Sequence, residues 1–244
     1  MYKFISVVVP VYNSASSIRE LCARLKVILN VLAEKYEIIL VDDGSKDNSV
    51  KQIKEAFADD IAIKLISLED NFGQQSAIMC GLRHAKGDYI ITIDDDLQNP
   101  PEEIEALMKE MEKGYDVVYG IPLVKKHSGT RNFGSSIANL LFDVVCSKPR
   151  NVRVSSFRVL KKSIVEAVIE EKSSFVYISA ATLKHTKNIG NVIVLHEARK
   201  HGSSSYNILK LLKLFYNIYI NYSSLSRVFV RNSKPQYVIK EMIL

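Results

Sequence analysis

The segment YIITIDDDLQNPPE, residues 89–102, places three aspartates, Asp94, Asp95 and Asp96, between an apolar run and a double proline. In a strand, side chains two positions apart point the same way, so Asp94 and Asp96 are expected on one side and Asp95 on the other. Magnesium and manganese bind oxygen ligands, and magnesium usually takes one or two carboxylates together with the phosphates of a substrate. The run therefore predicts a divalent-cation site that receives a phosphorylated ligand.

A solvated acidic turn is the alternative interpretation, and a short acidic motif on its own favours it. The surroundings favour the cation site. Apolar positions precede the aspartates, and Pro100 and Pro101 suit the first turn of a following helix. Open parallel sheets bind ligands at the carboxyl ends of their strands, which is where this pattern puts the three carboxylates.

On either side of this segment, apolar runs rich in β-branched residues alternate with segments of helical periodicity. The alternation predicts an α/β fold, with a mostly parallel sheet covered by helices on both faces. Strands are expected over residues 5–9, 37–41, 61–68, 88–93, 117–121, 157–160 and 191–196. Helices are expected after caps at Ser14 or Ser16 and at Asp47 or Asn48, from Pro100 onward, and over 73–86, 132–146, 162–170 and 176–184.

Polar loops follow the first three predicted strands as well. They contain Pro10, Tyr12 and Asn13, then Asp42, Asp43 and Ser45, then Asn71 and Gly73. A carboxylate such as Asp42 accepts a base N–H, and a tyrosine ring such as that of Tyr12 lies along a base face. Each loop alone is ordinary turn chemistry. Together, on one edge of the sheet, they predict a nucleotide pocket.

The end of the chain has a different composition. YNILKLLKLFYNIYINY, residues 206–222, is strongly apolar, with Lys210 and Lys213 away from its apolar stripe. An amphipathic helix of this kind lies in a membrane interface, or packs on its own domain or on a second subunit. The segment is short for a membrane span, which needs about 20 residues. We therefore expect a C-terminal amphipathic helical tail over residues 206–244.

Composition excludes several classes of protein. The 244 residues are 47% hydrophobic, enough for a packed core, and Cys22, Cys80 and Cys146 show neither disulfide nor zinc-site spacing. The apolar run before Pro10 is too short for a signal peptide or a membrane span. These features favour a reducing compartment, the cytoplasm. A net charge of +6 suits a polyanionic partner without selecting one.

The motifs SVVVPVYNS, VDDGSKDNS, NFGQQSAIMCGL and GDYIITIDDDLQNPPE together resemble the family 2 glycosyltransferases of GT-A fold. The resemblance extends over about residues 4 to 206, and is strongest to the branch of dolichyl-phosphate mannose synthases and bacterial polyprenyl-phosphate glycosyltransferases. It implies a GT-A domain over residues 1–205, with a nucleotide-sugar and metal half, 1–121, and an acceptor half, 122–205. It also implies inverting transfer of a sugar from a UDP- or GDP-linked donor, dependent on Mg or Mn.

The resemblance assigns roles to individual residues. Asp94 and Asp96 are implied as metal ligands with Gln98, and Asp95 is expected to face the donor. The nucleotide sugar is expected at Pro10, Tyr12, Asn13, Asp42, Asp43, Ser45, Gly73, Asp94 and Asp95. The acceptor or its phosphate is expected at Arg131, Phe157, Arg158, Arg199 and Ser204, the last two lying in RKHGSSSY. Asp95, Arg158 and Arg199 are the expected catalytic residues.

Three serines depart from the family pattern. Ser14 and Ser156 stand where an acidic residue is common, and Ser205 stands where a lysine is common. A sugar hydroxyl acceptor needs a general base, for which Asp95, Glu197 and Asp143 are alternatives, whereas an ionised phosphate acceptor needs none. The replacement at Ser156 is compatible with a lipid-phosphate acceptor.

The expected function is therefore transfer of a sugar to a polyprenyl-phosphate or lipid-linked glycan acceptor, in the synthesis of cell-surface polysaccharide or glycoconjugates. The expected location is the cytoplasmic face of a membrane, held peripherally, with homo-oligomers left open and no nucleic-acid partner. A relative that binds nucleotide sugar without turnover, acting in an assembly, is the alternative. A nucleotidyltransferase is disfavoured because PVYNSASSIRE, after the first strand, contains no glycine.

Overall fold

The computed structural model describes residues 1–123, 148–171, 173–197, 208–222 and 235–243. Among these residues, eight strands form one sheet in the order β7-β5-β6-β4-β1-β2-β3-β8. The strands β1 to β4, and β5 with β7, pair in parallel, whereas β6 and β8 run antiparallel to their neighbours. Their bounds are Tyr2–Val11 (β1), Ala33–Asp42 (β2), Ile63–Leu68 (β3), Tyr89–Thr92 (β4), Val117–Pro122 (β5), Arg158–Lys161 (β6), Ile189–Val194 (β7) and Ile239–Ile243 (β8). The predicted mostly parallel α/β sheet is confirmed.

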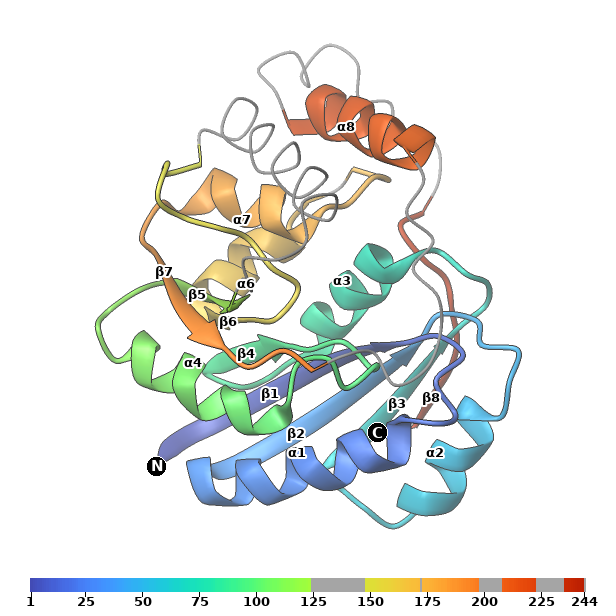
Figure 1. Ribbon diagram of the computed structural model, residues 1–244. Coiled ribbons are helices and arrows are strands. Elements are labelled where there is room, and N and C mark those ends of the chain that lie inside the picture. The colour runs from blue at the N-terminus through green and yellow to red at the C-terminus, as the bar shows by residue number, and fades with distance from the viewer. Residues whose placement is uncertain (124–147, 172, 198–207, 223–234, 244) are drawn as a thin grey trace.

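Helices cover both faces of the sheet (Figure 1). One face carries α1 (Ile18–Leu32), α2 (Ser49–Phe57) and α4 (Ile104–Met111), which follows the 3-10 turn Pro101–Glu103. The other face carries α3 (Gln74–His84), α6 (Lys162–Ile169) and α7 (Ile178–His185), with α8 (Ile208–Tyr222) packed beyond them. Because the central strands are buried on both faces, they are continuous apolar runs rather than alternating ones.

The helix α3 lies very close to β1, and a glycine makes this approach possible. A Cβ at Gly81 would lie 2.3 Å from Cγ1 of Val8 and 3.3 Å from Cγ2 of Val41. The start of α3 follows Gly73, whose φ of +91° is a conformation that glycine adopts readily. Gly81 thus allows α3 to pack closely on β1, and Gly73 allows the turn that leads into the helix.

The first helix begins later than the sequence indicates. It starts at Ile18 with Ser17 at the N-cap position, whereas Ser14 or Ser16 was expected there. The main-chain oxygen of Ser14 accepts hydrogen bonds from the N–H groups of Ser17 and Ile18, both at 3.0 Å, so the chain turns once before the helix. The predicted helix over 132–146 lies outside the described residues, as does Cys146, while Cys22 and Cys80 are buried free thiols.

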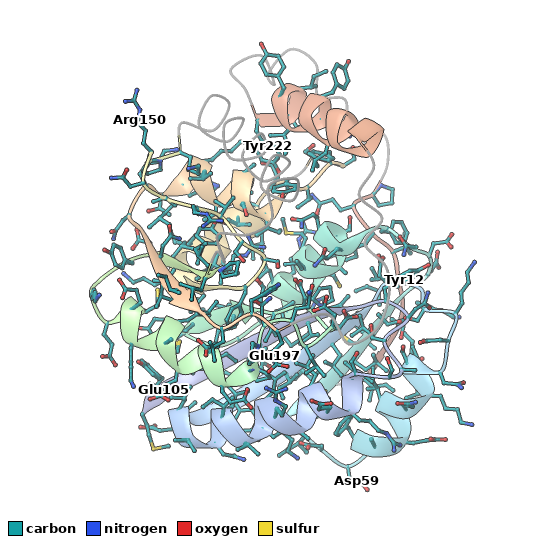
Figure 2. The ribbon with its side chains drawn as sticks, in the orientation of Figure 1. Tyr12, Asp59, Glu105, Arg150, Glu197 and Tyr222 are labelled. Carbon is teal, nitrogen blue, oxygen red and sulfur yellow. The ribbon has the colours of Figure 1, made fainter. Side chains whose placement is uncertain are left out.

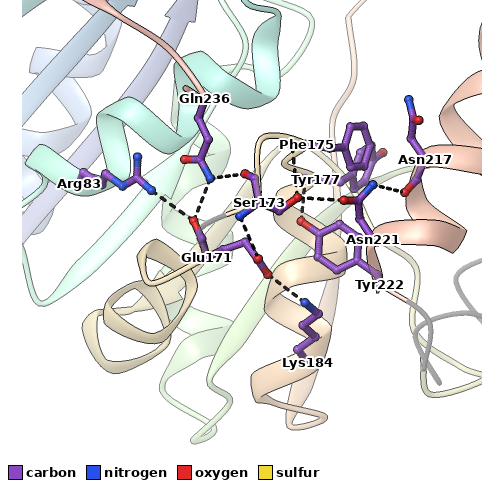
Figure 3. A network of polar contacts seen from close by, with 10 residues as sticks. All are labelled: Arg83, Glu171, Ser173, Phe175, Tyr177, Lys184, Asn217, Asn221, Tyr222 and Gln236. Carbon is purple, nitrogen blue, oxygen red and sulfur yellow. Dashed lines mark hydrogen bonds and ion pairs between the residues drawn. The ribbon is translucent and has the colours of Figure 1, made fainter. Parts of the chain in front are cut away.

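The helix α8 packs on the rest of the fold through a polar network (Figure 3). The Tyr222 hydroxyl accepts a hydrogen bond from the Tyr177 N–H at 3.0 Å, and the Ser173 hydroxyl donates to Asn221 at 2.8 Å. Ile218 and Tyr222 are buried, which supports packing of this helix face on its own domain. None of the described helices has the length and apolar character that crossing a membrane requires.

The expectation of a helical tail is wrong for its last part. Residues Ile239–Ile243 form β8, which pairs antiparallel with β3, for example Ile66 with Met242. The physical reason is that β3 would otherwise present unpaired N–H and C=O groups at the edge of the sheet. The tail therefore contributes both a helix and an edge strand.

Candidate active site

A cavity of about 430 Å³ lies at the carboxyl ends of β1 to β4. The described residues that line it come from the end of β1, from the loops that follow the four strands and from the start of α3: Pro10, Val11, Tyr12, Asp43, Asn71, Gly73, Gln74, Asp94, Asp95 and Asp96. Four of these ten described residues are carboxylates and none is basic. The cavity therefore attracts cations.

The three consecutive aspartates all line the cavity, which the predicted alternation does not explain. The strand β4 ends at Thr92, and Asp95 and Asp96 lie in a turn, so strand alternation does not govern their directions. The turn contains Leu97 at a φ of 60°, which reverses the chain directly after the carboxylates. Asp94 and Asp96 both line the cavity, as predicted, but strand geometry is not the cause.

Neutral donors hold the Asp94 carboxylate on both oxygens. The Gln74 side-chain amide donates to Oδ1 at 2.6 Å, and the Ser156 hydroxyl donates to Oδ2 at 2.6 Å. Asp96 accepts a hydrogen bond on Oδ1 from the Gln98 main-chain N–H at 3.1 Å. These contacts orient the two carboxylates, both of which belong to residues that line the cavity.

Asp95 connects the acidic turn to the loop after β1. Its Oδ2 accepts hydrogen bonds from the Tyr12 N–H at 3.0 Å and from the Ser14 hydroxyl. Burial raises the pKa of Asp95 to about 6, and the neighbouring Asp94 and Asp96 carboxylates add to the rise. Asp95 therefore anchors the β1 loop, and its expected role toward a donor sugar stays a prediction.

Asp43 performs a similar task for the loop after β3. Its two carboxylate oxygens accept hydrogen bonds from the Phe72 N–H at 2.7 Å and the Gly73 N–H at 2.9 Å. Burial raises the pKa of Asp43 to about 6, despite these two hydrogen bonds, which lower it. The ionised form of Asp43 thus places Asn71 and Gly73 at the cavity.

Asp42, Asn13 and Ser45 join the loops after β1 and β2. Asp42 is buried, accepts from the Ser45 N–H at 3.2 Å, and has a pKa raised by burial. The Ser45 hydroxyl accepts from the Asn13 N–H at 2.9 Å, and Asn13, at a φ of 54°, accepts from the Lys46 N–H at 2.8 Å. Asp42, Asn13 and Ser45 are not among the described residues that line the cavity, so their contact with a nucleotide stays a prediction.

Tyr12, by contrast, presents its side chain beside the cavity. The residue is 46% exposed and is labelled in Figure 2. Its N–H is fixed by Asp95, so the ring projects from a loop whose main chain is held in place. A partly exposed aromatic ring on a fixed loop is suited to stacking on a planar base.

The structure buries Phe157 and Arg158, the two described residues that are expected to contact the acceptor. Phe157 is fully buried in the core, and Arg158 is 1% exposed. The Arg158 guanidinium donates to the hydroxyl of Thr92 at 3.1 Å and to that of Ser179 at 2.8 Å. Neither residue is among the described residues that line this cavity, and their expected contact with an acceptor stays a prediction.

Several expected site residues lie outside the described residues: Arg131, Arg199, Ser204 and Ser205, together with the alternative base Asp143. The other alternative base, Glu197, is described. Its N–H donates to the Gln98 main-chain oxygen at 2.8 Å, and its carboxylate lies 4.0 Å from the Arg24 guanidinium. Glu197 is not among the residues that line the cavity.

The residues present fit a divalent cation that is bound together with a ligand. Asp94 and Asp96 offer carboxylate oxygens, the donors that magnesium and manganese take. Within the described part of the chain, no group of three His, Cys, Asp or Glu side chains could hold a metal by itself. Ligand phosphates would complete the coordination. Gln98 contacts Asp96 through its main chain, and its expected role as a ligand stays a prediction.

Sequence reasoning missed three side chains that shape the site. Gln74 and Ser156 hold Asp94, and Ser14 holds Asp95. Gln74 follows directly on the Asn71–Gly73 loop, so its position in the chain was a usable signal. The two serines were noticed only as departures from a family pattern, because their partners are 62 and 81 positions away in the chain.

Comparisons with known proteins identify relatives that are glycosyltransferases. The sequence model described as "Glycosyl transferase family 2" matches residues 6–169. The chain is 37% identical over 219 residues to an undecaprenyl-phosphate 4-deoxy-4-formamido-L-arabinose transferase of Edwardsiella ictaluri, covering 88% of this chain and 67% of the relative. It is 39% identical to the protein of that name from Yersinia pestis, covering 88% and 66%. The chain thus spans about two thirds of the length of these relatives.

Among solved structures, the chain is similar to glucosyl-3-phosphoglycerate synthase from Mycobacterium tuberculosis. The complex of that enzyme with Mn²⁺, UDP and glucosyl-3-phosphoglycerate gives a TM-score of 0.65 at 18% identity, covering 98% of this chain and 86% of the other. Its complex with Mn²⁺ and UDP-glucose gives a TM-score of 0.65 at 17% identity, with the same coverage. At this identity the likeness shows the fold alone, which is of GT-A type.

Proposed function

Because the chain belongs to glycosyl transferase family 2, we propose that it transfers a sugar from a nucleotide-diphosphate sugar to a polyprenyl phosphate. The observation that carries the proposal is the cavity at the carboxyl ends of β1 to β4, lined by Asp94, Asp95 and Asp96. The names of the two relatives support this acceptor, because both contain undecaprenyl phosphate. The proposal places the enzyme in the synthesis of cell-surface polysaccharide or glycoconjugates.

We propose that the donor is bound by the four loops around this cavity. Tyr12 would stack on the base, and Pro10, Asn13, Asp42, Asp43, Ser45 and Gly73 would shape the nucleotide site. Asp94 and Asp96, with Gln98, would hold a magnesium or manganese ion together with the diphosphate. When bound, this ion neutralises the negative charge that develops on the leaving diphosphate. The structural neighbour's complexes with Mn²⁺ and UDP support this pairing by analogy of fold.

The acceptor in this proposal arrives ionised. The Ser156 hydroxyl donates to Asp94, and a hydroxyl in that state is not a general base. Glu197 lies near Arg24, and Asp95 is occupied by Tyr12 and Ser14. A phosphate oxygen can attack the sugar without first losing a proton, so these residues need not supply a base. Arg131, Arg199 and Ser204 stay proposed contacts of the acceptor phosphate.

We also propose that α8 contacts the membrane surface from which a lipid acceptor would come. Ile218 and Tyr222 face the protein, while Tyr216 is 65% exposed and Tyr219 47% exposed. Tyrosine suits a membrane interface, because its ring is apolar and its hydroxyl remains hydrated. Peripheral attachment at the cytoplasmic face is the arrangement that we propose, and formation of homo-oligomers stays a prediction.

The test is a donor screen. Purified protein is incubated with UDP- and GDP-sugars and Mn²⁺, with and without polyprenyl phosphate, and products are identified by mass spectrometry. We expect metal-dependent transfer that needs the lipid phosphate. Asp96→Ala should abolish transfer without unfolding the chain, whereas the control Asp59→Ala, on the exposed turn after α2, should behave as wild type (Figure 2).

Two results would contradict the proposal. Nucleotide binding without turnover or hydrolysis of any donor would favour the alternative, a relative that binds nucleotide sugar as an assembly partner. Wild-type transfer by Asp96→Ala would refute the assignment of the cation to the acidic turn.

A further inference from the structure

We propose that Arg158 is a positioning residue for the Asp94 carboxylate: it holds the Thr92 hydroxyl, which fixes the Ser156 main chain, and the Ser156 side chain orients Asp94. We call these four residues the Asp94 relay. The inference rests on the proposed function, since that function gives Asp94 a divalent cation to bind. It assigns to Arg158 a task other than the contact with substrate that its sequence motif suggested.

The relay follows from the pairing of two strands. Thr92, the last residue of β4, lies opposite Arg158, the first residue of β6. The Arg158 Nε–H donates to the Thr92 hydroxyl at 3.1 Å, and this hydroxyl donates to the Ser156 main-chain oxygen at 2.5 Å. The Ser156 hydroxyl in turn donates to Asp94 Oδ2 at 2.6 Å. The Thr92 bond ends on the Ser156 main chain and the Asp94 bond begins at the Ser156 hydroxyl, so the two are joined by the covalent frame of Ser156. Thr92 therefore acts on Asp94 by fixing the main chain from which the Ser156 hydroxyl projects.

Burial makes the inner end of the relay rigid. Arg158 and Thr92 are each 1% exposed. The guanidinium also donates to the Ser179 hydroxyl at 2.8 Å and lies 5.9 Å from the centroid of the Tyr119 ring. Among the described residues, no carboxylate forms an ion pair with it. Burying a cation is costly, and replacing a buried charged side chain by an apolar one of similar size often leaves stability unchanged. Stability alone therefore does not account for Arg158, whereas its hydrogen bond to Thr92 provides a role for the buried guanidinium.

The outer end of the relay fixes one oxygen of a carboxylate that lines the cavity. Gln74 holds the other oxygen at 2.6 Å, so Asp94 is oriented from two sides. Partners that orient a ligating carboxylate in this way typically change metal affinity by about 10- to 100-fold when they are removed. Loss of the relay should therefore weaken binding of the cation without removing any of its ligands.

The experiment measures Mn²⁺ binding directly, by electron paramagnetic resonance titration in the presence of UDP and, in parallel, of GDP. Thr92→Val removes the central hydroxyl and keeps the shape of the side chain, and Ser156→Ala removes the last link. We expect each to weaken Mn²⁺ binding about tenfold. Thr92→Ser restores the hydroxyl and should bind as wild type. Thr182→Val is the matched control, because Thr182 is a buried threonine of α7 whose hydroxyl has no hydrogen-bond partner among the described residues.

A double variant separates a relay from two independent defects. If Thr92 acts through Ser156, Thr92→Val combined with Ser156→Ala should bind Mn²⁺ no more weakly than Ser156→Ala alone. Wild-type binding by Ser156→Ala, or additive losses in the double variant, would overturn the relay. Since Ser156 is only half-buried, its variant should fold even where Thr92→Val does not. Absence of Mn²⁺ binding by the wild type with either nucleotide would refute the metal-dependent proposed function, and the relay with it.

Discussion

Acidification from pH 7 to pH 5 should weaken donor binding. It should at the same time increase the contribution of Asp43 to the stability of the fold. The ionised carboxylate of Asp43 accepts two N–H groups, at 2.7 and 2.9 Å, and so holds the loop of Phe72 and Gly73 at the cavity. A protonated carboxyl carries a hydrogen on one oxygen, which then accepts its N–H much less strongly than a carboxylate oxygen does. Protonation should therefore release the loop and weaken donor binding.

The pKa of Asp43 sets the size of both effects. With a pKa of about 6, the carboxylate is about nine-tenths ionised at pH 7 and about one-tenth ionised at pH 5, so donor affinity should fall roughly tenfold. The usual aspartate pKa is 3.8, so the folded state binds more protons than the unfolded state between pH 3.8 and 6. Stability is therefore lost as the pH rises through this range, and the Asp43 contribution increases by about 1 kcal/mol from pH 7 to pH 5.

The comparison variant is Asp43→Asn, which keeps the size of the side chain and removes its titration. Affinity for UDP or GDP, at saturating Mn²⁺, and free energy of unfolding in urea are measured for both proteins at pH 5, 6 and 7. The difference between the proteins is needed because burial also raises the pKa of Asp95 to about 6. A difference in affinity that does not change with pH, or a stability difference that changes in the other direction, would refute the reasoning.

Three further predictions concern the scaffold. Gly81→Ala should lower the free energy of unfolding by about 2 kcal/mol, measured in urea, because the added Cβ would meet Val8 at 2.3 Å; an unchanged midpoint would contradict the close packing of α3 on β1. Lys64→Met should cost about 3 kcal/mol in the same assay, since it leaves the buried Glu37 carboxylate without the ammonium 2.7 Å away; a neutral effect would show that the other donors to Glu37 suffice. Tyr222→Phe should remove the acceptor of a main-chain N–H, at a cost of about 1–2 kcal/mol, and speed amide hydrogen exchange in α8; unchanged exchange would mean that apolar packing alone holds this helix.

The sequence predicted those parts of the site that depend only on where a strand ends and which loop follows it. The strands β1 to β4 are apolar runs that end in polar loops, and parallel pairing brings those loops together at one edge. Tyr12, Asp43, Gly73 and the three aspartates were placed at the cavity on this basis alone. Each of these predictions needed only the end of a strand and the direction of its neighbours.

The remainder depends on contacts that no local pattern records. The strand β6 pairs with β4 across more than 60 positions of sequence, and this pairing buries Arg158 and brings Ser156 to Asp94. The motif around Arg158 does not reveal that its side chain points into the core. Strand alternation likewise failed for Asp94 to Asp96, because the strand ends at Thr92, before the aspartates, and no longer sets the directions of their side chains.

The strand β8 bears on how this protein is synthesised. Its partner β3 ends at Leu68, and roughly 170 further residues must be added before Ile239 can pair with it. At typical translation rates this takes about 10 to 30 s, during which the outer edge of the nascent sheet has no partner from its own chain. An unpaired edge is a template for strands of other molecules. Slow synthesis, or a ribosome that stalls before residue 239, should therefore favour aggregation at β3 over completion of the fold.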